Sequence, residues 1–306
     1  MTNEQYLKNL CTPKGKIDVV LDTDTYNEID DQFAIAYLLK NQDKLCVKGF
    51  CAAPYLNEKS TSPEDGMEKS YNEIFKVLKL AGEEKFSSVV FKGSRNYLPD
   101  EKTPVQSEAA TFMAKLADEY SPENPLYIVA IGAITNVASA MLKNPKMAEN
   151  CVIVWLGGNG KHMPYAAREF NMMQDIAAAR VILSSGVPFI DLPCGGVVTH
   201  FATTKPELEY WLKGKNPLAD YLAQNTIDEA EAYAHGKPWS RVIWDVTAIA
   251  WLVNDDNRFM NDEIIKCPVP EYDLRYAADS YGHFIKYVYN IKRDALFEDL
   301  FKKLGE

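Results

Sequence analysis

The chain has 306 residues, of which 47% are hydrophobic and 25% charged, and its formal net charge is −10 at pH 7. The acidic balance argues against nucleic acid as a partner, because proteins that bind phosphate backbones usually carry a basic stripe. No run is long and apolar enough for a transmembrane helix, so no membrane partner is expected. The polar N-terminus lacks an apolar signal core, and we therefore expect a cytoplasmic protein.

The first two thirds of the chain alternate between strand-like and helix-like segments. In chain order, hydrophobic patterning predicts a strand at 16–21, a helix at 32–39, a strand at 47–52, a helix at 67–80, a strand at 88–91, a helix at 108–120, a strand at 126–131, a helix at 135–142, a strand at 151–156, a helix at 175–184 and a strand at 189–192. Such alternation indicates an α/β fold with a mainly parallel central sheet and helices on both faces.

The last third of the chain is more helical. Helices are predicted at 206–211, 217–225 and 245–253, and a late strand at 285–291 precedes a terminal helix. No linker, repeat or low-complexity stretch divides the chain. We therefore expect a single domain that spans residues 1–306.

An acidic turn follows the first predicted strand. The sequence DTDTYNEIDD places five acids, Asp22, Asp24, Glu28, Asp30 and Asp31, where the strand meets the next helix. Ligands of open α/β sheets bind at this end of the strands. Clustered carboxylates repel one another unless a hard cation with oxygen ligands neutralises them, and the absence of nearby His or Cys disfavours zinc. The alternative is a solvated loop that caps the helix.

Four segments follow one another along the chain and together span Ile17 to Leu252. They are VVLDTDTYNEIDDQFAIAYLL, AIGAITNVASAM, WLGG followed by REFNMMQDIAAA, and VIWDVTAIAWL. In this order they resemble the motifs of the inosine-uridine preferring nucleoside hydrolase family. The resemblance implies a Rossmann-like nucleoside hydrolase fold and hydrolysis of the N-glycosidic bond of a ribonucleoside to free base and ribose. It also implies a part in nucleoside catabolism and purine salvage, and a homodimer or homotetramer.

The resemblance further implies a metal site. Asp24 matches the acid that binds calcium and takes a proton from the attacking water, so it is the expected catalytic residue. Asp31, Asp245 and the main-chain carbonyl of Ile131 match the remaining metal ligands. The expected ion is Ca²⁺, and Mg²⁺ stays open because oxygen ligands suit both ions.

Residues that match the ribose contacts of the family come from the same motifs. Asp30, Glu169 and Asn171 are expected to bind the ribose hydroxyls, and Asp245 is expected to touch the ribose as well as the metal. Asn27 is a further candidate for substrate binding. Without the other motifs, Glu169 and Asn171 are equally well explained as a helix cap.

The sequence departs from the family pattern at several positions. The turn TYNEI between Asp24 and Asp30 is two residues longer than the usual one, which makes the alignment of Asn27 uncertain. Ala53 stands where the family has an Asn after the second strand. Another family Asn, before Glu169, has no counterpart near Met163, and Asn159 replaces it only if the loop is rearranged.

Trp244 stands where many members of the family have a His that helps protonate the leaving base. Purine-specific members resemble this chain in carrying Trp there. An indole is no general acid at neutral pH, but it stacks on a flat base, so a purine-leaning substrate is expected. The alternative is a core Trp. A second stacking wall could come from one of four aromatic loop residues, Trp239, Tyr26, Tyr55 and Tyr165. His235, also in a loop, is a candidate proton donor.

Two other functions remain open from the sequence. Asp22, Asp24 and Thr25 fit the D-x-D-x-T motif of a haloacid dehalogenase-type phosphatase, although the later G-D pair of that class is missing. The second alternative is a non-catalytic, metal-dependent nucleoside-binding protein, in which changes around the ribose have abolished hydrolysis.

Overall fold

An eight-stranded sheet forms the centre of the computed structural model, which describes residues 1–306. Its strand order is β3-β2-β1-β4-β5-β6-β10-β9. The strands are β1 (Ile17–Thr23), β2 (Leu45–Ala52), β3 (Val90–Phe91), β4 (Leu126–Ala130), β5 (Cys151–Leu156), β6 (Phe189–Leu192), β9 (Met260–Pro270) and β10 (Tyr276–Ile291). All neighbours pair in parallel except β9, which lies antiparallel to β10 at the edge. The predicted α/β fold is confirmed.

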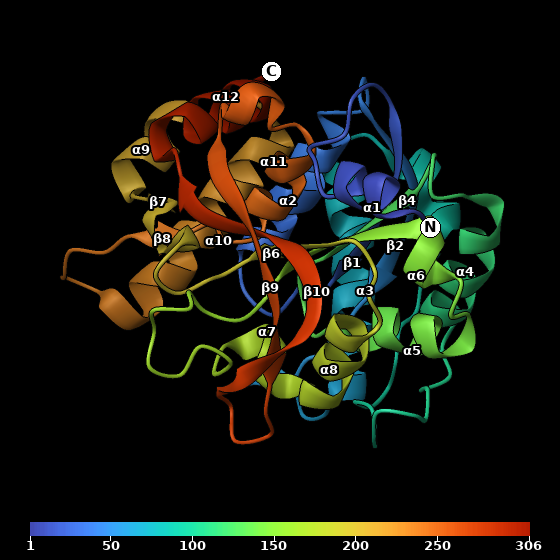
Figure 1. Cartoon of the computed structure of the whole chain (residues 1–306). Helices are drawn as coiled ribbons and strands as arrows, with labels where there is room; N and C mark the ends of the chain where they lie inside the picture. The colour runs from blue at the N-terminus through green and yellow to red at the C-terminus, as the bar shows by residue number, and fades with distance from the viewer.

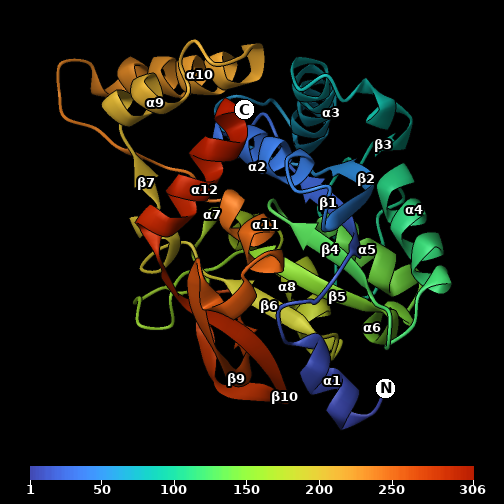
Figure 2. The same cartoon turned by 90° about the horizontal axis from the view of Figure 1, so that it is seen from above.

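Helices cover both faces of the sheet (Figures 1 and 2). One face packs against α2 (Asp30–Leu39), α3 (Pro63–Leu80), α11 (Val246–Leu252) and α12 (Arg293–Gly305), and the other against α4 (Glu108–Leu116), α5 (Thr135–Lys143) and α8 (Ile176–Ser184). Strand β1 shows why both faces are apolar, since Val19 and Leu21 enter one core and Val20 the other. None of the helices has the length and apolar character that a membrane span requires.

The remaining elements lie around this framework. They are α1 (Asn3–Asn9), α6 (Met147–Asn150), α7 (Phe170–Gln174), α9 (Lys205–Trp211), α10 (Pro217–Ala234), the short antiparallel pair β7 (Ala202–Thr203) and β8 (Arg241–Val242), and 3₁₀ turns at Glu84–Val89, Ala117–Glu119, Val198–His200 and Asp255–Asn257. Several helices begin at caps that the sequence supplies. Ser62, for example, accepts a hydrogen bond from the Asp65 N–H and is followed by Pro63 at the first helical position.

Several elements differ from the sequence-based expectation. The β9–β10 hairpin is longer than the predicted strand at 285–291, because β9 was not foreseen and β10 begins at Tyr276. Helix α10 continues to Ala234 rather than ending near Asn225, and α1 was not predicted. Residues 88 and 89, expected in a strand, belong to a 3₁₀ turn.

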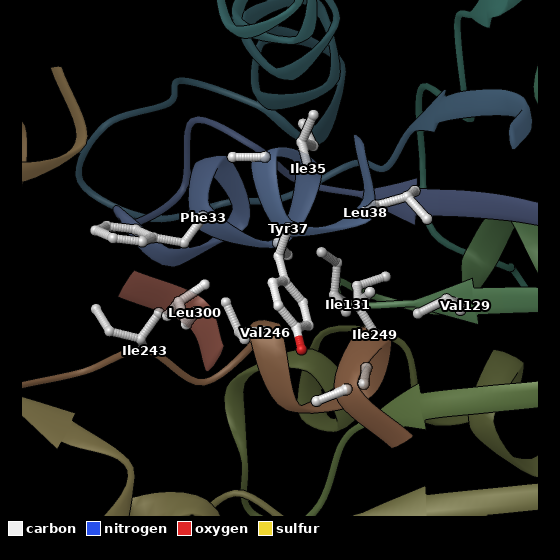
Figure 3. Packing of buried hydrophobic residues seen from close by; sticks show 14 of the residues in the cluster. Phe33, Ile35, Tyr37, Leu38, Val129, Ile131, Ile243, Val246, Ile249 and Leu300 are labelled. Carbon is white, nitrogen blue, oxygen red and sulfur yellow. The ribbon is translucent and has the colours of Figure 1, made fainter. Parts of the chain in front are cut away.

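The contact between α2 and α11 positions the acidic turn. Figure 3 shows Tyr37 of α2 pointing between Val246 and Ile249 of α11, with Ile131 beside it and Phe33, also of α2, to the left of this group. All five residues are almost completely buried. This packing fixes the first residues of α2 and α11 next to the end of β4. Polar residues at the start of α2, at the start of α11 and after β4 are therefore close to one another.

Candidate active site

A cavity of about 290 Å³ lies where β1, β4, β5 and β6 end. The predicted site residues Asp24, Asn27, Asp30, Ile131, Glu169, Asn171, Trp244 and Asp245 all line it. Asp31, the ninth, lies beside Asp30 and Asp245. Segments far apart in the sequence thus converge on one cavity, at the edge of the sheet where ligands of such folds bind.

Asp24 is the buried carboxylate that follows β1. It is 1% exposed, and neither of its carboxylate oxygens has a hydrogen-bond partner. Gly132 leaves the room for it, because a Cβ at Gly132 would lie 3.0 Å from Asp24 Cγ and 3.2 Å from the Cβ of Ala53. A buried, unpaired carboxylate is costly unless a positive charge compensates it. The carboxylate of Asp24 therefore fits a cation ligand.

Asp30, Asp31 and Asp245 form a compact group at the starts of α2 and α11. One ligand oxygen from each lies within 4.8 Å of the others. Asp31 Oδ1 accepts a hydrogen bond from Thr23 Oγ1 at 2.5 Å, and Asp30 Oδ2 accepts one from the Asp245 N–H at 3.3 Å. The sequence placed Asp24 with Asp31 and Asp245 as metal ligands, whereas this closest group contains Asp30 as its third member.

Burial and mutual repulsion disfavour the ionised forms of these carboxyls. Burial raises the pKa of Asp24 well above its usual value, and the charges of Asp31 and Asp30 raise it further. Burial, with the charges of Asp30 and Asp31, likewise raises the pKa of Asp245. The pKa of Asp31 is raised to about 7 by burial, although the hydrogen bond from Thr23 opposes the shift. A divalent cation among these groups would favour their ionised forms.

Ile131 and Asn171 connect the carboxylates to the neighbouring strand ends. The carbonyl of Ile131 accepts one hydrogen bond, from Asn171 Nδ2 at 3.3 Å, and a carbonyl oxygen has two lone pairs. Asn171 Nδ2 also donates to the carbonyl of Leu156 at 3.0 Å. The amide of Asn171 is therefore held by the ends of β4 and β5.

Glu169 is both a helix cap and a residue of the cavity wall. Its carboxylate accepts hydrogen bonds from the N–H groups of Gly158 at 2.8 Å, and of Asn171 and Met172 at 3.0 Å each. Glu169 is therefore the N-cap of α7, as the helix-cap interpretation expects. These bonds fix the carboxylate in place at the cavity.

The longer acidic turn contributes two residues to the cavity. Asn27 Oδ1 accepts a hydrogen bond from Asn57 Nδ2 at 2.6 Å, which orients the Asn27 amide. Glu28 Oε2 lies 2.9 Å from Arg241 Nη2. Asn27 was a sequence-based candidate, whereas the place of Glu28 in the cavity wall was not foreseen.

Asn159 also lines the cavity, a position that the sequence allowed only with a rearranged loop. The loop after β5 turns at Gly158, where φ is +73°, and the Asn159 N–H donates to the carbonyl of Ala166 at 2.6 Å. Asn159 Oδ1 accepts from the Gly195 N–H at 2.8 Å. Met163, near the expected position of that Asn, is exposed and lies outside the cavity lining.

Trp244 lines the cavity and is also half-buried against the core. Its position is therefore compatible both with stacking on a base and with a packing role in the core. Phe170 is the other aromatic residue in the wall, and no sequence pattern singled it out. The aromatic residues proposed for a second stacking wall lie elsewhere: Trp239, Tyr26, Tyr55 and Tyr165. His235, at the end of α10, is exposed and is not part of the cavity wall either.

Asp22 occupies a different environment from Asp24. It is fully buried, accepts a hydrogen bond from Asn136 Nδ2 at 2.7 Å and does not line the cavity. Burial raises its pKa to about 7. A carboxylate enclosed in this way is a poor nucleophile for the phosphatase alternative, which requires Asp22 to reach a substrate.

The sequence is also similar to those of known proteins. The family model described as inosine-uridine preferring nucleoside hydrolase matches residues 19–279. The pyrimidine-specific ribonucleoside hydrolase RihA of Klebsiella pneumoniae is 31% identical over 161 residues, which are 50% of this chain and 50% of that protein, so the match spans about half the length of this curated relative.

Two solved structures share the fold. A plant nucleoside hydrolase superposes with a TM-score of 0.73 at 19% identity, and the match covers 94% of this chain and 99% of that one. A purine-preferring ribonucleoside hydrolase from Gardnerella vaginalis gives a TM-score of 0.69 at 19% identity, covering 94% and 98%.

Proposed function

This chain belongs to the inosine-uridine preferring nucleoside hydrolase family, and we propose that it hydrolyses the N-glycosidic bond of a ribonucleoside to free base and ribose. The observation that carries the proposal is the convergence of buried carboxylates from the β1–α2 turn and the start of α11 on one cavity. A cavity of about 290 Å³ suits a small molecule.

We propose that Asp24, Asp31, Asp245 and the carbonyl oxygen of Ile131 hold a divalent cation, with calcium as the expected ion. The unpaired, buried oxygens of Asp24 and the spare lone pair of the Ile131 carbonyl support this assignment. Calcium takes six to eight oxygen ligands, and magnesium also accepts carboxylates. When bound, such an ion polarises water and stabilises negative charge.

The side chains around the cavity then have distinct roles. The Asp24 carboxylate accepts a proton from the attacking water, a contribution of ~10²–10⁴-fold in rate for general base catalysis. As the glycosidic bond breaks, positive charge develops on the ribose ring, and the carboxylates of Asp30 and Asp245 stabilise it. Glu169, fixed by three main-chain N–H groups, and Asn171 bind ribose hydroxyls.

Among uncharged bases, we propose a preference for purines over pyrimidines, because Trp244 offers an aromatic face in the cavity wall. The names of similar proteins do not decide the base, since the curated relative is described as pyrimidine-specific and the Gardnerella vaginalis enzyme as purine-preferring. We also propose a homodimer or homotetramer, which light scattering of the purified chain tests.

The experiment is a ribose-release assay over purine and pyrimidine nucleosides, with calcium, magnesium or a chelator. We expect turnover that the chelator abolishes, and loss of detectable turnover in Asp31→Asn. The matched control is Asp255→Asn, because Asp255 is an exposed acid that pairs with Lys44 away from the cavity. Near-normal turnover in Asp31→Asn contradicts the metal assignment. Calcium-dependent nucleoside binding without base release supports the non-catalytic alternative.

A further inference from the structure

The wall of the cavity is strongly acidic. Asp24, Glu28, Asp30, Glu169 and Asp245 line it, and no Lys, Arg or His is among the lining residues. A single divalent cation neutralises only part of this charge. The cavity therefore favours a ligand that carries positive charge itself.

Glu28 is the carboxylate in this wall that the longer turn adds. Its Oε2 is held by Arg241 Nη2 at 2.9 Å, and the same Nη2 lies 3.2 Å from Oε1 of Glu229, so one guanidinium serves two carboxylates. Glu229 is in turn 2.7 Å from Lys59 Nζ. This network orients the partly exposed Glu28 carboxylate, which borders this cavity beside the chain segment that leads from Arg241 to Trp244 and also borders a second cavity.

The wall also lacks a His that could give a proton to a departing base. Trp244 lines the wall, but an indole does not protonate a base at neutral pH. His162 is packed against the glycines of the neighbouring loops, where its Cε1 would lie 2.7 Å from a Cβ at Gly160. It does not line the cavity. A neutral base therefore leaves without help from an imidazole.

We propose that the preferred substrates are ribonucleosides whose base carries a permanent positive charge, such as N-ribosylpyridinium compounds and N7-alkylated purine nucleosides. The proposal rests on the proposed hydrolase function and specifies its substrate class. The water oxygen bonds to C1′ while the C1′–N bond breaks. The electron pair of the broken C1′–N bond stays on the base nitrogen and neutralises the positive charge of the base. One proton of the water passes to Asp24, and the base needs none.

Trp244 and Glu28 act together in this recognition. A cationic ring stacked on the indole gains a cation–π interaction that a neutral ring lacks. The Glu28 carboxylate adds a Coulombic attraction that depends on its charge. Replacing Glu28 by Gln removes the charge but keeps the shape, so selectivity for charge should fall while stacking persists.

The test compares nicotinamide riboside, whose base is cationic, with nicotinic acid riboside, whose base carries a compensating carboxylate. 7-Methylguanosine and guanosine form a second pair. Base release by the full chain with calcium gives kcat/KM for each. We expect nicotinamide riboside to exceed nicotinic acid riboside by at least ~10-fold, and Glu28→Gln to reduce that ratio several-fold. In Glu229→Gln, which changes the other partner of Arg241 outside this cavity, the ratio should hold within about twofold.

The outcomes separate the two proposals. Suppose that neutral nucleosides are hydrolysed and that the ratio of kcat/KM for nicotinamide riboside to that for nicotinic acid riboside is near one. The substrate class is then wrong and the hydrolase function stands. The same conclusion follows if Glu28→Gln leaves this ratio unchanged in a protein with wild-type thermal unfolding. If neither charged nor neutral nucleosides are cleaved in the presence of calcium, the hydrolase function fails and the substrate class fails with it.

Discussion

Replacement of Asp24 by Asn should stabilise the metal-free protein. The Asp24 oxygens are buried without a hydrogen-bond partner, and the neighbouring Asp30 and Asp31 repel its charge. An Asn keeps the shape, removes the repulsion, and has an amide N–H that can donate to the adjacent carboxylates. Since a buried unsatisfied polar group costs about 1–3 kcal/mol, we expect the free energy of unfolding of the metal-free protein to rise by a similar amount.

The same substitution should remove most of the stabilisation by calcium. At a calcium concentration of 100 times Kd, binding to the folded state adds about 2.7 kcal/mol. For a chain of 306 residues, with an unfolding entropy of about 2.1 cal/mol/K per residue, that corresponds to roughly 4 °C in Tm. In Asp24→Asn, which lacks one carboxylate ligand, we expect a Tm shift below ~2 °C under the same conditions.

The assay is thermal unfolding followed by circular dichroism, in chelator and in calcium, with Asp255→Asn as the exposed-acid control. The reasoning fails if Asp24→Asn lowers the Tm of the metal-free protein and keeps the full calcium shift. That combination would mean that Asp24 supports the fold through contacts other than a cation.

Other substitutions test separate parts of the structure. Trp244→Ala should reduce kcat/KM for purine nucleosides by roughly 5–100-fold, because base stacking contributes ~1–3 kcal/mol, and pyrimidines should lose less; equal losses would assign the Trp to the core alone. Gly132→Ala should lower kcat by ~10-fold or more, because its Cβ would lie 3.0 Å from Asp24 Cγ and must displace the carboxylate; an unchanged kcat and calcium affinity would show that Asp24 tolerates displacement. Burial raises the pKa of Asp191 in β6 well above its usual value, so its contribution to stability is present below about pH 4 and is lost as the pH rises through the raised pKa. Urea unfolding should therefore show a weaker loss of stability with rising pH in Asp191→Asn than in the wild type, and parallel pH profiles would contradict this.

The alternation of apolar strands and amphipathic helices was sufficient to predict the parallel part of the sheet. Strand β9 was missed because its sequence, MNDEIIKCPVP, mixes charges with two prolines and shows no clean alternation. Such composition is tolerated there because β9 is the edge strand and pairs only with β10. The structure reveals it through its antiparallel pairing with β10, the next strand in the chain.

The acids of the site were predictable for a local reason. Asp24, Asp30 and Asp31 are close in sequence at a strand-to-helix turn, so their proximity follows from the chain itself. Phe170, Asn159 and the pairing of Glu28 with Arg241 were not, because each depends on how a loop returns to the sheet. For Asn159, the available signal in the sequence was the preceding pair Gly157-Gly158, which permits the turn that the structure makes at Gly158 with a φ of +73°.

A crystal structure of the calcium-loaded protein tests the central claim most directly, through the anomalous signal and ligand distances of the ion. The account predicts one calcium with a carboxylate oxygen from each of Asp24, Asp31 and Asp245, and the carbonyl oxygen of Ile131, at about 2.3–2.6 Å. An ion held by Asp30 with Asp31 and Asp245, and with Asp24 turned away from it, would contradict the assignment of Asp24 as ligand and base.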